Sequence, residues 1–420
     1  MKITIHRGSH EIGGSCVEVE GRAGSRLLLD IGQPLMNTEK QPPSLPDRLD
    51  GVLISHAHQD HYGLLDLVGD AAPCYLSAPT RRLIELTGQY TGKDYSRPEY
   101  RTFSSHRPFP CGEFRITPYL VDHSAFDAHG FLIEDGANRI FYSGDFRGHG
   151  RKAALLDHLE MQPPSPVDAL LLEGTMLGHP AEKIRTEQEI EEKIAAALRE
   201  HRGLAFVTVS GQNIDRLVTL YRACIRSGRK LVIDPYVGHV LREIHGFSPN
   251  IPFPSMEYGR NLGVYFPQRL CRRMRLRLGL GHLLDEFGFL RVRQRELAAD
   301  PGRYLVLARD SMAAELSERL GGLAENALFL YSLWRGYWEE EKMQKLRGWV
   351  EERKMNLVYA HTSGHAYPAT LQRLAEAMAP KQIIPIHTLF PEEYPALFRQ
   401  PVRIVHDGEG IVLSESEEEP

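Results

Sequence analysis

The sequence of 420 residues lacks any uninterrupted apolar stretch long enough to span a bilayer, for which about 20 residues are needed. Its first residues, 1–6, are typical of an edge strand and lack the apolar core of a signal peptide. Its five cysteines are odd in number and widely spaced, so we expect reduced thiols and no disulfide framework. These absences predict a cytoplasmic protein that has no contact with a membrane.

A positive net charge is also missing, because the formal charge is −5 at pH 7, which by itself disfavours a nucleic-acid partner. However, four of the acidic residues, Glu415 and 417–419, fall in a tail that we expect to be disordered. Arginines gather elsewhere, at Arg269, Arg272, Arg273, Arg275 and Arg277, and again at Arg291, Arg293 and Arg295. This run fits either a solvated helix face or a surface that follows a nucleic-acid backbone, and the sequence leaves both open.

Potential metal ligands, in contrast, are concentrated between residues 54 and 63. His56, His58, Asp60 and His61 follow the apolar residues 51–54, which predict a short buried strand, so all four lie on the loop at its carboxyl end. The spacing of His56 and His58 directs two nitrogens to one ion, and it leaves Asp60 and His61 for a second. A lone loop histidine is usually solvated or bonded to backbone, but four ligands within six residues indicate a metal site.

Further ligand types follow other apolar stretches that read as strands. They are His123 after 114–121, Asp145 after 139–142, Glu173 after 170–172, His365 after 357–359 and His387 after 382–386. Gly144 permits a tight turn before Asp145, whose two oxygens suit it to bridge two cations. His129 and His361 lie near these positions, and their roles remain open. Strands that end repeatedly in such residues predict a site along one rim of a sheet.

These motifs resemble those of the metallo-β-lactamase-fold nucleases of the β-CASP group, the kin of ribonuclease J and of the nuclease that cleaves pre-mRNA 3′ ends. The resemblance covers nearly the whole chain, with Asp30 at the first motif, 56–61 at the second, His123 at the third, Asp145 at the fourth, and Glu173, His365 and His387 at motifs A, B and C. It implies that His56, His58 and His123 hold one zinc, that Asp60, His61 and His387 hold the other, and that Asp145 bridges them.

Asp30 and Glu173 are expected to support other residues of the site. Asp30 resembles the aspartate that braces the ligand loop, because ligating imidazoles must be oriented through their other nitrogen. Glu173 is expected to pair with His365 and to raise its proton affinity, so that His365 acts as a general acid. Asp60, Glu173 and His365 are thus the catalytic candidates. The alternative is that Asp30 and Glu173 only cap adjacent backbone groups.

The fold class predicted is α/β, namely a metallo-β-lactamase αββα sandwich with an inserted β-CASP α/β domain. The motif strands stop near residue 180 and resume near 355, and the segment between them has its own βα rhythm. We therefore expect a first part of the metallo-β-lactamase domain at 1–180, the β-CASP insertion at 181–355, the returning part at 356–413 and the acidic tail at 414–420.

Substrate contacts are predicted in two places. Ser210 and Asn213 lie where a strand ends and a helix opens, so free amides there favour a phosphate, although plain N-capping explains them equally well. Thr362, Ser363 and Gly364, just before His365, offer hydroxyls and amides to a phosphate, and similar residues do so in ribonuclease J. Trp334 or Tyr337 either stacks on a base or packs in the interior.

The activity predicted from these residues is two-metal hydrolysis of phosphodiester bonds in single-stranded nucleic acid, by endonucleolytic attack, 5′-exonucleolytic attack or both. Mixed imidazole and carboxylate ligation suits two Zn²⁺ first and Mn²⁺ second. RNA is favoured because His387 fills motif C, where DNA-directed relatives generally have an aliphatic residue. A DNA-directed nuclease of the same family is the alternative. The chain is expected to lack the carboxyl-terminal domain of ribonuclease J, which leaves the oligomeric state open, a homodimer included.

Other members of the superfamily fit the sequence less well. A small-molecule hydrolase shares the first four motifs but lacks a second domain and the set Glu173, His365 and His387. A diiron oxidoreductase usually carries a further carboxylate where this chain has Gln59, together with a flavin module. A silent scaffold subunit would have lost ligands, and every ligand position is filled here.

Overall fold

The computed structural model describes residues 1–35, 41–69, 72–97, 99–179 and 185–413, so the predicted acidic tail lies outside the described residues. The chain forms two compact units. Unit 1 comprises Met1–Ile184 and Gly364–Pro420, and unit 2 comprises Arg185–Ser363. Among the described residues, no helix combines the length and the apolarity that are needed to cross a membrane.

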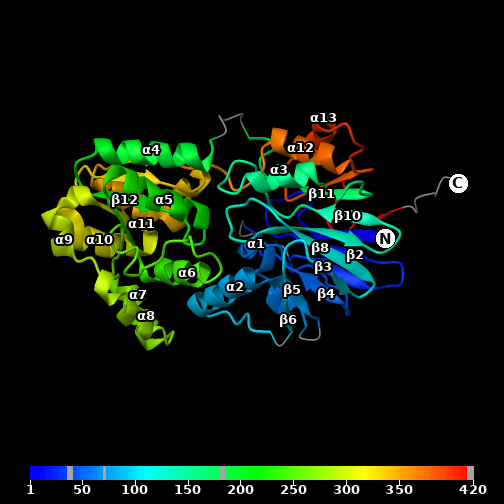
Figure 1. Ribbon diagram of the computed structural model, residues 1–420, viewed down its shortest axis with the longest axis horizontal. Helices are drawn as coiled ribbons and strands as arrows, with labels where there is room; N and C mark the ends of the chain where they lie inside the picture. Colours follow the sequence, from blue (N-terminus) through cyan, green and yellow to red (C-terminus); the bar gives the residue numbers. More distant parts are fainter. Residues whose placement is uncertain (36–40, 70–71, 98, 180–184, 414–420) are drawn as a thin grey trace. The chain divides into compact units, whose positions relative to one another are not determined.

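Unit 1 is built on two β-sheets (Figure 1). The first has the order β19-β1-β2-β3-β4-β5-β6, formed by β1 (Lys2–Arg7), β2 (Cys16–Glu20), β3 (Arg26–Leu29), β4 (Gly51–Leu53), β5 (Cys74–Ser77), β6 (Tyr100–Phe103) and β19 (Gly410–Val412). The second has the order β18-β11-β10-β9-β8-β7, formed by β7 (Phe109–Cys111), β8 (Phe114–Leu120), β9 (His129–Glu134), β10 (Arg139–Tyr142), β11 (Ala169–Glu173) and β18 (Ile383–Ile386). The helices are α1 (Gln59–Tyr62), α2 (Ala78–Thr91), α3 (Ala154–Met161), α12 (Pro368–Met378) and α13 (Tyr394–Leu397).

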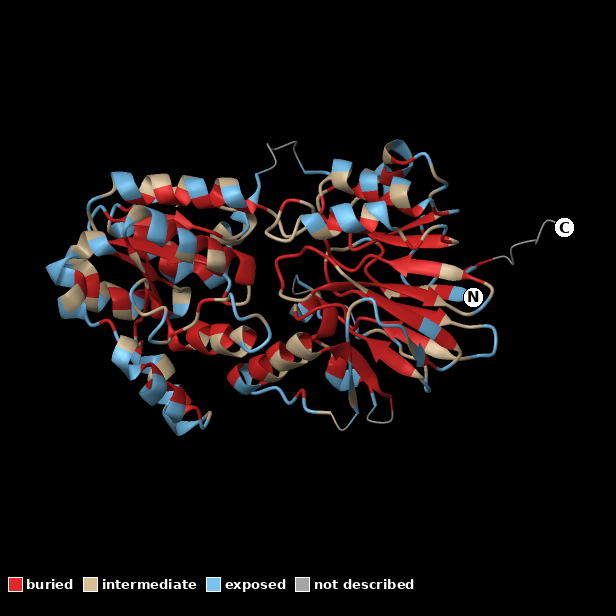
Figure 2. Cartoon of the chain, viewed as in Figure 1, coloured by how far each residue is buried: buried red, intermediate tan, exposed pale blue. Residues whose placement is uncertain are grey.

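The core of unit 1 lies between the two sheets because alternate residues of each strand point to the same face. Ile3 and Ile5 of β1 share one apolar cluster with Phe131 and Ile133 of β9. The outer face of the second sheet is covered by α3 and α12, where Leu172 of β11 belongs to the same cluster as helix residues such as Leu156 and Leu374. Helix α2 packs against β5 and β6 of the first sheet. The predicted αββα sandwich is therefore confirmed (Figures 1 and 2).

The amino-terminal strand differs from the prediction of an edge strand. β1 lies between β2 and β19 and pairs antiparallel with both, for example Lys2 with Val412 and Ile3 with Ile411. The edge position belongs to the short strand β19 instead. Pairing between the two ends of the chain is non-local, and the periodicity of residues 1–6 carries no information about it.

Unit 2 contains a sheet in which all strand pairs are parallel, with the order β14-β13-β15-β12-β16-β17. Its strands are β12 (Ala205–Thr208), β13 (Lys230–Ile233), β14 (Leu262–Val264), β15 (Tyr304–Leu307), β16 (Leu328–Tyr331) and β17 (Asn356–Tyr359). Its helices are α4 (Glu187–Glu200), α5 (Ile214–Ser227), α6 (Pro235–His245), α7 (Gln268–Leu276), α8 (Gly281–Glu286), α9 (Gln294–Ala299), α10 (Ala313–Leu320) and α11 (Gln344–Glu352). β12 and β16 are buried at every residue, as expected for central strands of a sheet that is covered on both faces.

The boundary of the inserted unit differs from the predicted one. The sequence placed the return to the first domain at residue 356, but β17 (Asn356–Tyr359) pairs with β16 and closes the edge of the unit 2 sheet. The return lies at Gly364. The short apolar segment 357–359 fits a strand of either sheet equally well, and its partner strand is decided by tertiary packing.

Candidate metal centre

The predicted ligands converge in unit 1 at the carboxyl ends of strands. His56 and His58 follow β4, and Asp60 and His61 lie in α1. The other candidates follow strands of the second sheet or precede a helix: His123 follows β8, Asp145 follows β10, Glu173 ends β11, His387 follows β18 and His365 precedes α12. Loops at strand ends hold functional side chains on a rigid scaffold.

The first ligand group consists of His56, His58 and His123, whose ligand nitrogens all lie within 4.8 Å of one another. Nε2 of His123 lies 3.2 Å from Nδ1 of His58. Two nitrogens that bind one tetrahedral Zn²⁺ at about 2.0–2.1 Å are about 3.3 Å apart. The spacing of these two imidazoles therefore fits a shared cation.

The second group contains Asp60, His61, Asp145 and His387, again with ligand atoms within 4.8 Å of one another. Oδ2 of Asp145 lies 3.1 Å from Nε2 of His61, and Oδ2 of Asp60 lies 3.4 Å from Nε2 of His387. The same Asp145 oxygen is 3.8 Å from His56 Nε2 and 3.9 Å from His123 Nε2. Asp145 is thus the carboxylate that touches both groups, as a bridging ligand must.

The outer nitrogens of four imidazoles are held by hydrogen bonds. Nδ1 of His61 donates to Asp30 Oδ2 at 2.7 Å, and Nδ1 of His123 donates to the carbonyl of Gly364 at 2.6 Å. Because carboxylate and carbonyl oxygens only accept, each of these rings carries its proton on Nδ1 and presents the lone pair of Nε2 to the site.

The other two rings follow the same pattern. Ser55 Oγ donates to Asp30 and lies 3.0 Å from Nδ1 of His56, so it accepts from that ring. Thr175 Oγ1 donates to the carbonyl of His387 and lies 2.8 Å from Nδ1 of the same residue. Both arrangements place the ring proton on Nδ1, and His56 and His387 therefore also direct Nε2 inward.

The site also contains buried acceptors that the protein itself does not satisfy. His56 Nε2 and Asp145 Oδ1 are buried and have no hydrogen-bond partner among the described residues. Burial lowers the pKa of His56 and of His123 well below the usual value, which keeps both rings neutral. Burial would raise the pKa of Asp60, but the neighbouring His61 and His387 lower it to about 2. Neutral imidazoles and ionised carboxylates are the forms that bind metal, and His56, His123 and Asp60 are already in these forms. Burial would lower the pKa of His61, but the charges of Asp145, Asp30 and Asp60 raise it well above the usual value, so a cation bound there would displace a proton from this ring.

Asp30 supports the ligand loop. It is fully buried and accepts four hydrogen bonds of 2.7 Å, from the amide of Ser55, the hydroxyl of Ser55, Nδ1 of His61 and the hydroxyl of Tyr142. Its φ of 56° lies in the left-handed region that non-glycine residues rarely adopt. The predicted bracing role and the alternative of backbone capping thus coexist in one side chain.

Replacement of Asp30 by Asn should weaken metal binding without removing a ligand. The amide nitrogen of Asn would face a donor at one of the contacts that Asp30 now accepts, so His61 would lose its fixed tautomer. We expect metal affinity to fall roughly 10- to 100-fold, measured by competition with a fluorescent chelator. Asp66→Asn, at an exposed position of the same unit, is the matched control. Unchanged affinity in Asp30→Asn would assign Asp30 to backbone capping alone.

His365 and Glu173 lie together beside Asp145. Nδ1 of His365 is 3.5 Å from Glu173 Oε2 and 3.6 Å from Asp145 Oδ2. Burial alone would lower the pKa of His365, but the charges of Asp145 and Glu173 raise it to about 9. The side chain of His365 is 21% exposed, whereas Glu173 is buried. A protonated imidazole that remains open to solvent is suited to donate a proton.

The contacts of Glu173 and His365 also fit their alternative roles, which are backbone capping for Glu173 and metal binding for His365. Glu173 also accepts from the amides of Thr175 and Ala366 at 3.0 Å, so it caps backbone as well as facing His365. His365 forms ligand-like groups with His123 and Asp145 and with Glu173 and His387. A direct role for His365 in metal binding is therefore the competing interpretation of the same positions.

The predicted substrate-binding residues have varied surroundings. Ser210 is exposed, and Asn213 caps α5 by accepting from the amide of Arg216 at 2.9 Å. Thr362 donates its hydroxyl to the carbonyl of Arg185, and Ser363 is half-buried. Gly364 accepts from His123, as described above. Helix capping accounts for the contact of Asn213, and the carbonyl of Gly364 orients the ligand His123. Phosphate binding by these five residues stays a prediction.

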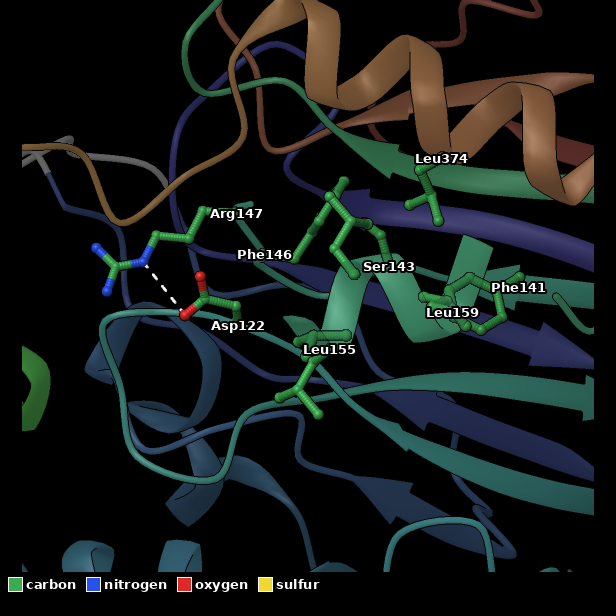
Figure 3. Close-up of a pocket in the computed structure, with 10 residues that line it drawn as sticks. Asp122, Phe141, Ser143, Phe146, Arg147, Leu155, Leu159 and Leu374 are labelled. Atoms are coloured by element: carbon green, nitrogen blue, oxygen red, sulfur yellow. Dashed lines mark ion pairs between the residues drawn. The ribbon is translucent and has the colours of Figure 1, made fainter. Parts of the chain in front are cut away.

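A buried ion pair connects two of the ligand loops. Nε of Arg147 lies 3.5 Å from Oδ1 of Asp122, with both side chains fully buried, and the amide of Arg147 donates to the carbonyl of Asp122 (Figure 3). The other carboxylate oxygen of Asp122 accepts from the amide of Gly150 at 2.7 Å. Asp122 precedes His123 and Arg147 follows Asp145, so the pair fixes the separation of these two ligands. The adjoining cavity holds only about 10 Å³ and is no substrate site.

Several residues that support the metal ligands were not predicted from the sequence. Ser55, Thr175 and Tyr142 contact Asp30 or a ligand histidine, and the pair Asp122 and Arg147 ties two loops together. Ser55 and Thr175 lie close to motif residues at strand ends, and this position could have indicated a supporting role. A single hydroxyl residue, however, does not by itself predict such a role. His129, whose role was open, bonds to the carbonyl of Asp127 and belongs to no ligand group among the described residues.

The sequence of this chain is similar to those of several known proteins. A family model described as beta-lactamase superfamily domain matches residues 26–204. Ribonuclease J of Mycolicibacterium smegmatis is 21% identical over 408 residues, which cover 92% of this chain and 68% of that protein. Transcription termination factor FttA of Methanothermobacter thermautotrophicus is 27% identical over 278 residues, covering 58% of this chain and 42% of that protein.

Two further proteins are similar to this chain, one in sequence and one in fold. The RNase J-like protein of Methanocaldococcus jannaschii is 28% identical over 207 residues, covering 45% of this chain and 47% of that protein. The crystal structure of a protein of unknown function from Enterococcus faecalis V583 superposes with a TM-score of 0.78 at 19% identity, covering 98% of this chain and 99% of that one. The chain spans from 42% to 68% of the length of these three curated relatives. The chain is therefore similar to the beta-lactamase superfamily domain over residues 26–204 and to ribonuclease J over most of its length.

Proposed function

We propose that the chain is a two-metal phosphodiesterase that hydrolyses single-stranded RNA, by endonucleolytic attack, 5′-exonucleolytic attack or both. The observation that carries the proposal is Asp145, whose carboxylate contacts both ligand groups at 3.1–3.9 Å. Ribonuclease J relatives supply the substrate class. The mixture of imidazoles and carboxylates suits Zn²⁺ first and Mn²⁺ second.

The residues of the site would have separate roles in such a reaction. His56, His58 and His123 would hold one cation, Asp60, His61 and His387 the other, and Asp145 both. When bound, the two cations would supply an activated water and neutralise the charge that develops on the phosphoryl oxygens. His365 would protonate the leaving oxygen, and Glu173 would keep His365 protonated through its charge. Asp30 would hold His61 in the tautomer that the site requires.

The substrate test compares labelled single-stranded RNA with DNA of the same sequence, each with a 5′-hydroxyl or a 5′-monophosphate. We expect the wild-type chain to degrade the RNA at least 10-fold faster than the DNA, with loss of activity on chelation. A product ladder from internal sites indicates endonucleolytic attack, whereas release of mononucleotides and dependence on the 5′-monophosphate indicate 5′-exonucleolytic attack. Preferred cleavage of DNA would instead support the DNA-directed alternative.

A small-molecule hydrolase remains the second alternative, and it predicts a different result. Such an enzyme would hydrolyse lactone or thioester substrates and leave both nucleic acids intact. The homodimer considered above is tested separately, by light scattering of the metal-loaded chain.

A further inference from the structure

Helix α7 presents a strongly cationic surface in unit 2. Of its nine residues only Met274 is buried, and Leu270 and Cys271 are half-buried beside it. These positions, spaced three and four apart, form one helix face. The opposite face carries Arg269 and Arg272, with Arg273 and Arg275 at its sides, and all four are exposed. Figure 2 shows α7 and α8 coloured largely as exposed.

Several arginines of this segment have no acidic partner among the described residues. Residues 260–303 contain ten arginines but only four acidic side chains, in a chain whose net charge is −5. Arg275 pairs with Asp285 at 2.7 Å, whereas Arg269, Arg272 and Arg277 form no ion pair with any described residue. Arg269 and Arg273, four residues apart, repel one another and destabilise the helix. Neutral polar residues would be more favourable at these positions if solvation were their only role.

A neighbouring segment adds to the same surface. The guanidinium of exposed Arg291 lies 5.1 Å from the ring centre of Phe266, the residue that precedes Pro267 at the start of α7. We refer to Arg269, Arg272, Arg273, Arg277 and Arg291 together as the α7 surface.

Apolar side chains are also exposed on this part of unit 2. Leu276 is 71% exposed and follows Arg272 by four residues, and Phe289 is 54% exposed. A merely solvated helix face has no need of large apolar groups. Single-stranded nucleic acid offers both a charged backbone and apolar base and sugar surfaces, which matches arginines mixed with Leu276 and Phe289.

We propose that the α7 surface binds the phosphodiester backbone of the single-stranded RNA substrate, as a positioning surface separate from the metal ligands of unit 1. This inference rests on the proposed function. The helix is about 13 Å long at 1.5 Å per residue, which is enough to contact a few successive phosphates. Arginine suits this role because its planar fork binds phosphate oxygens in pairs.

The test removes two outward-facing charges, by Arg269→Gln together with Arg272→Gln. The matched control is Arg202→Gln with Arg303→Gln, which removes two exposed arginines that precede β12 and β15 of the same unit. Single-turnover cleavage of a 20-nucleotide unstructured RNA by excess protein gives the half-saturating protein concentration at several salt concentrations. Hydrolysis of bis(p-nitrophenyl) phosphate reports on the metal centre alone.

We expect the α7 variant to raise the half-saturating concentration several-fold at low salt and to reduce its logarithmic salt dependence by about 1.4, since each backbone contact to a single strand contributes about 0.7. Hydrolysis of the small diester, metal content and thermal unfolding should match the wild type, because both residues are exposed. The control variant should retain the wild-type salt dependence.

Three results would overturn the inference. An unchanged salt dependence in the α7 variant, with RNA still cleaved by the wild type, would make the surface a solvated face and leave the proposed function intact. An equal loss in the control variant would show that any two arginines have the same effect. Failure of the wild-type chain to cleave RNA would refute the proposed function as well, and it is recognised before any variant is made.

Discussion

His365→Ala should reduce turnover of RNA by roughly 10² to 10⁴, the usual contribution of a general acid, while leaving metal content and substrate affinity nearly unchanged. The expectation follows from the position of the ring: Nδ1 faces Glu173 and Asp145 at 3.5 and 3.6 Å, and the side chain is partly open to solvent. Single-turnover kinetics give the rate of the chemical step, and elemental analysis of the same preparation gives the metal content.

Glu173→Gln is the companion variant and tests the charge that Glu173 exerts. A general acid works while it is protonated, so activity that depends on His365 is lost as the pH rises through its pKa. Asp145 and Glu173 raise this pKa to about 9, and removal of the Glu173 charge lowers it. The alkaline loss of activity should therefore move to lower pH. The double variant should be little worse than His365→Ala, because the two residues act as a unit.

The competing role of His365 gives an opposite result. His365 also lies in a ligand-like group with His123 and Asp145. If it is a metal ligand, His365→Ala loses at least one cation together with the activity. Loss of metal would assign His365 to the metal centre and move the search for the acid to His361. His158→Ala, an exposed histidine in α3, controls for the loss of an imidazole from the same unit.

The sequence predicted the elements that local patterns encode. The apolar stretch 139–142 is strand β10 with the bounds expected from the sequence, and the stretches 114–121 and 382–386 exceed β8 and β18 by one residue each. Each is an apolar segment that is followed directly by a polar residue, which marks its end. The metal ligands were accessible for a similar reason, since they cluster within 56–61 or follow strands that end at one sheet edge.

What the sequence did not predict depends on contacts between distant residues. The pairing of β1 with β19 joins the two ends of unit 1, and the placement of β17 beside β16 depends on packing that no local pattern records. The same holds within the site. Thr175 meets His387 and Gly364 meets His123 only because the fold brings their strands together.

Among the metal ligands, Asp145 is the residue whose replacement we expect to be most damaging. Asp145→Ala should abolish stable binding of both cations, since one oxygen of this carboxylate lies within 3.9 Å of His56, His61 and His123. The wild-type chain should contain about two transition-metal ions, as expected for a two-metal site, and Asp145→Ala should contain less than one by elemental analysis. Activity should fall below detection. Asp66→Ala, an exposed carboxylate of unit 1, should keep both ions.

Stability provides a readout of Asp145 that does not depend on activity. A ligand that binds only the folded state stabilises it by about 4 kcal/mol at 1,000 times its Kd, so chelation should lower the thermal transition of the wild type. Asp145→Ala should unfold at the same temperature with and without chelator, because it has no tightly bound cation to lose. If this variant retains both ions and its sensitivity to chelator, Asp145 is no bridge, and the two groups, His56, His58 and His123 against Asp60, His61 and His387, bind their cations independently.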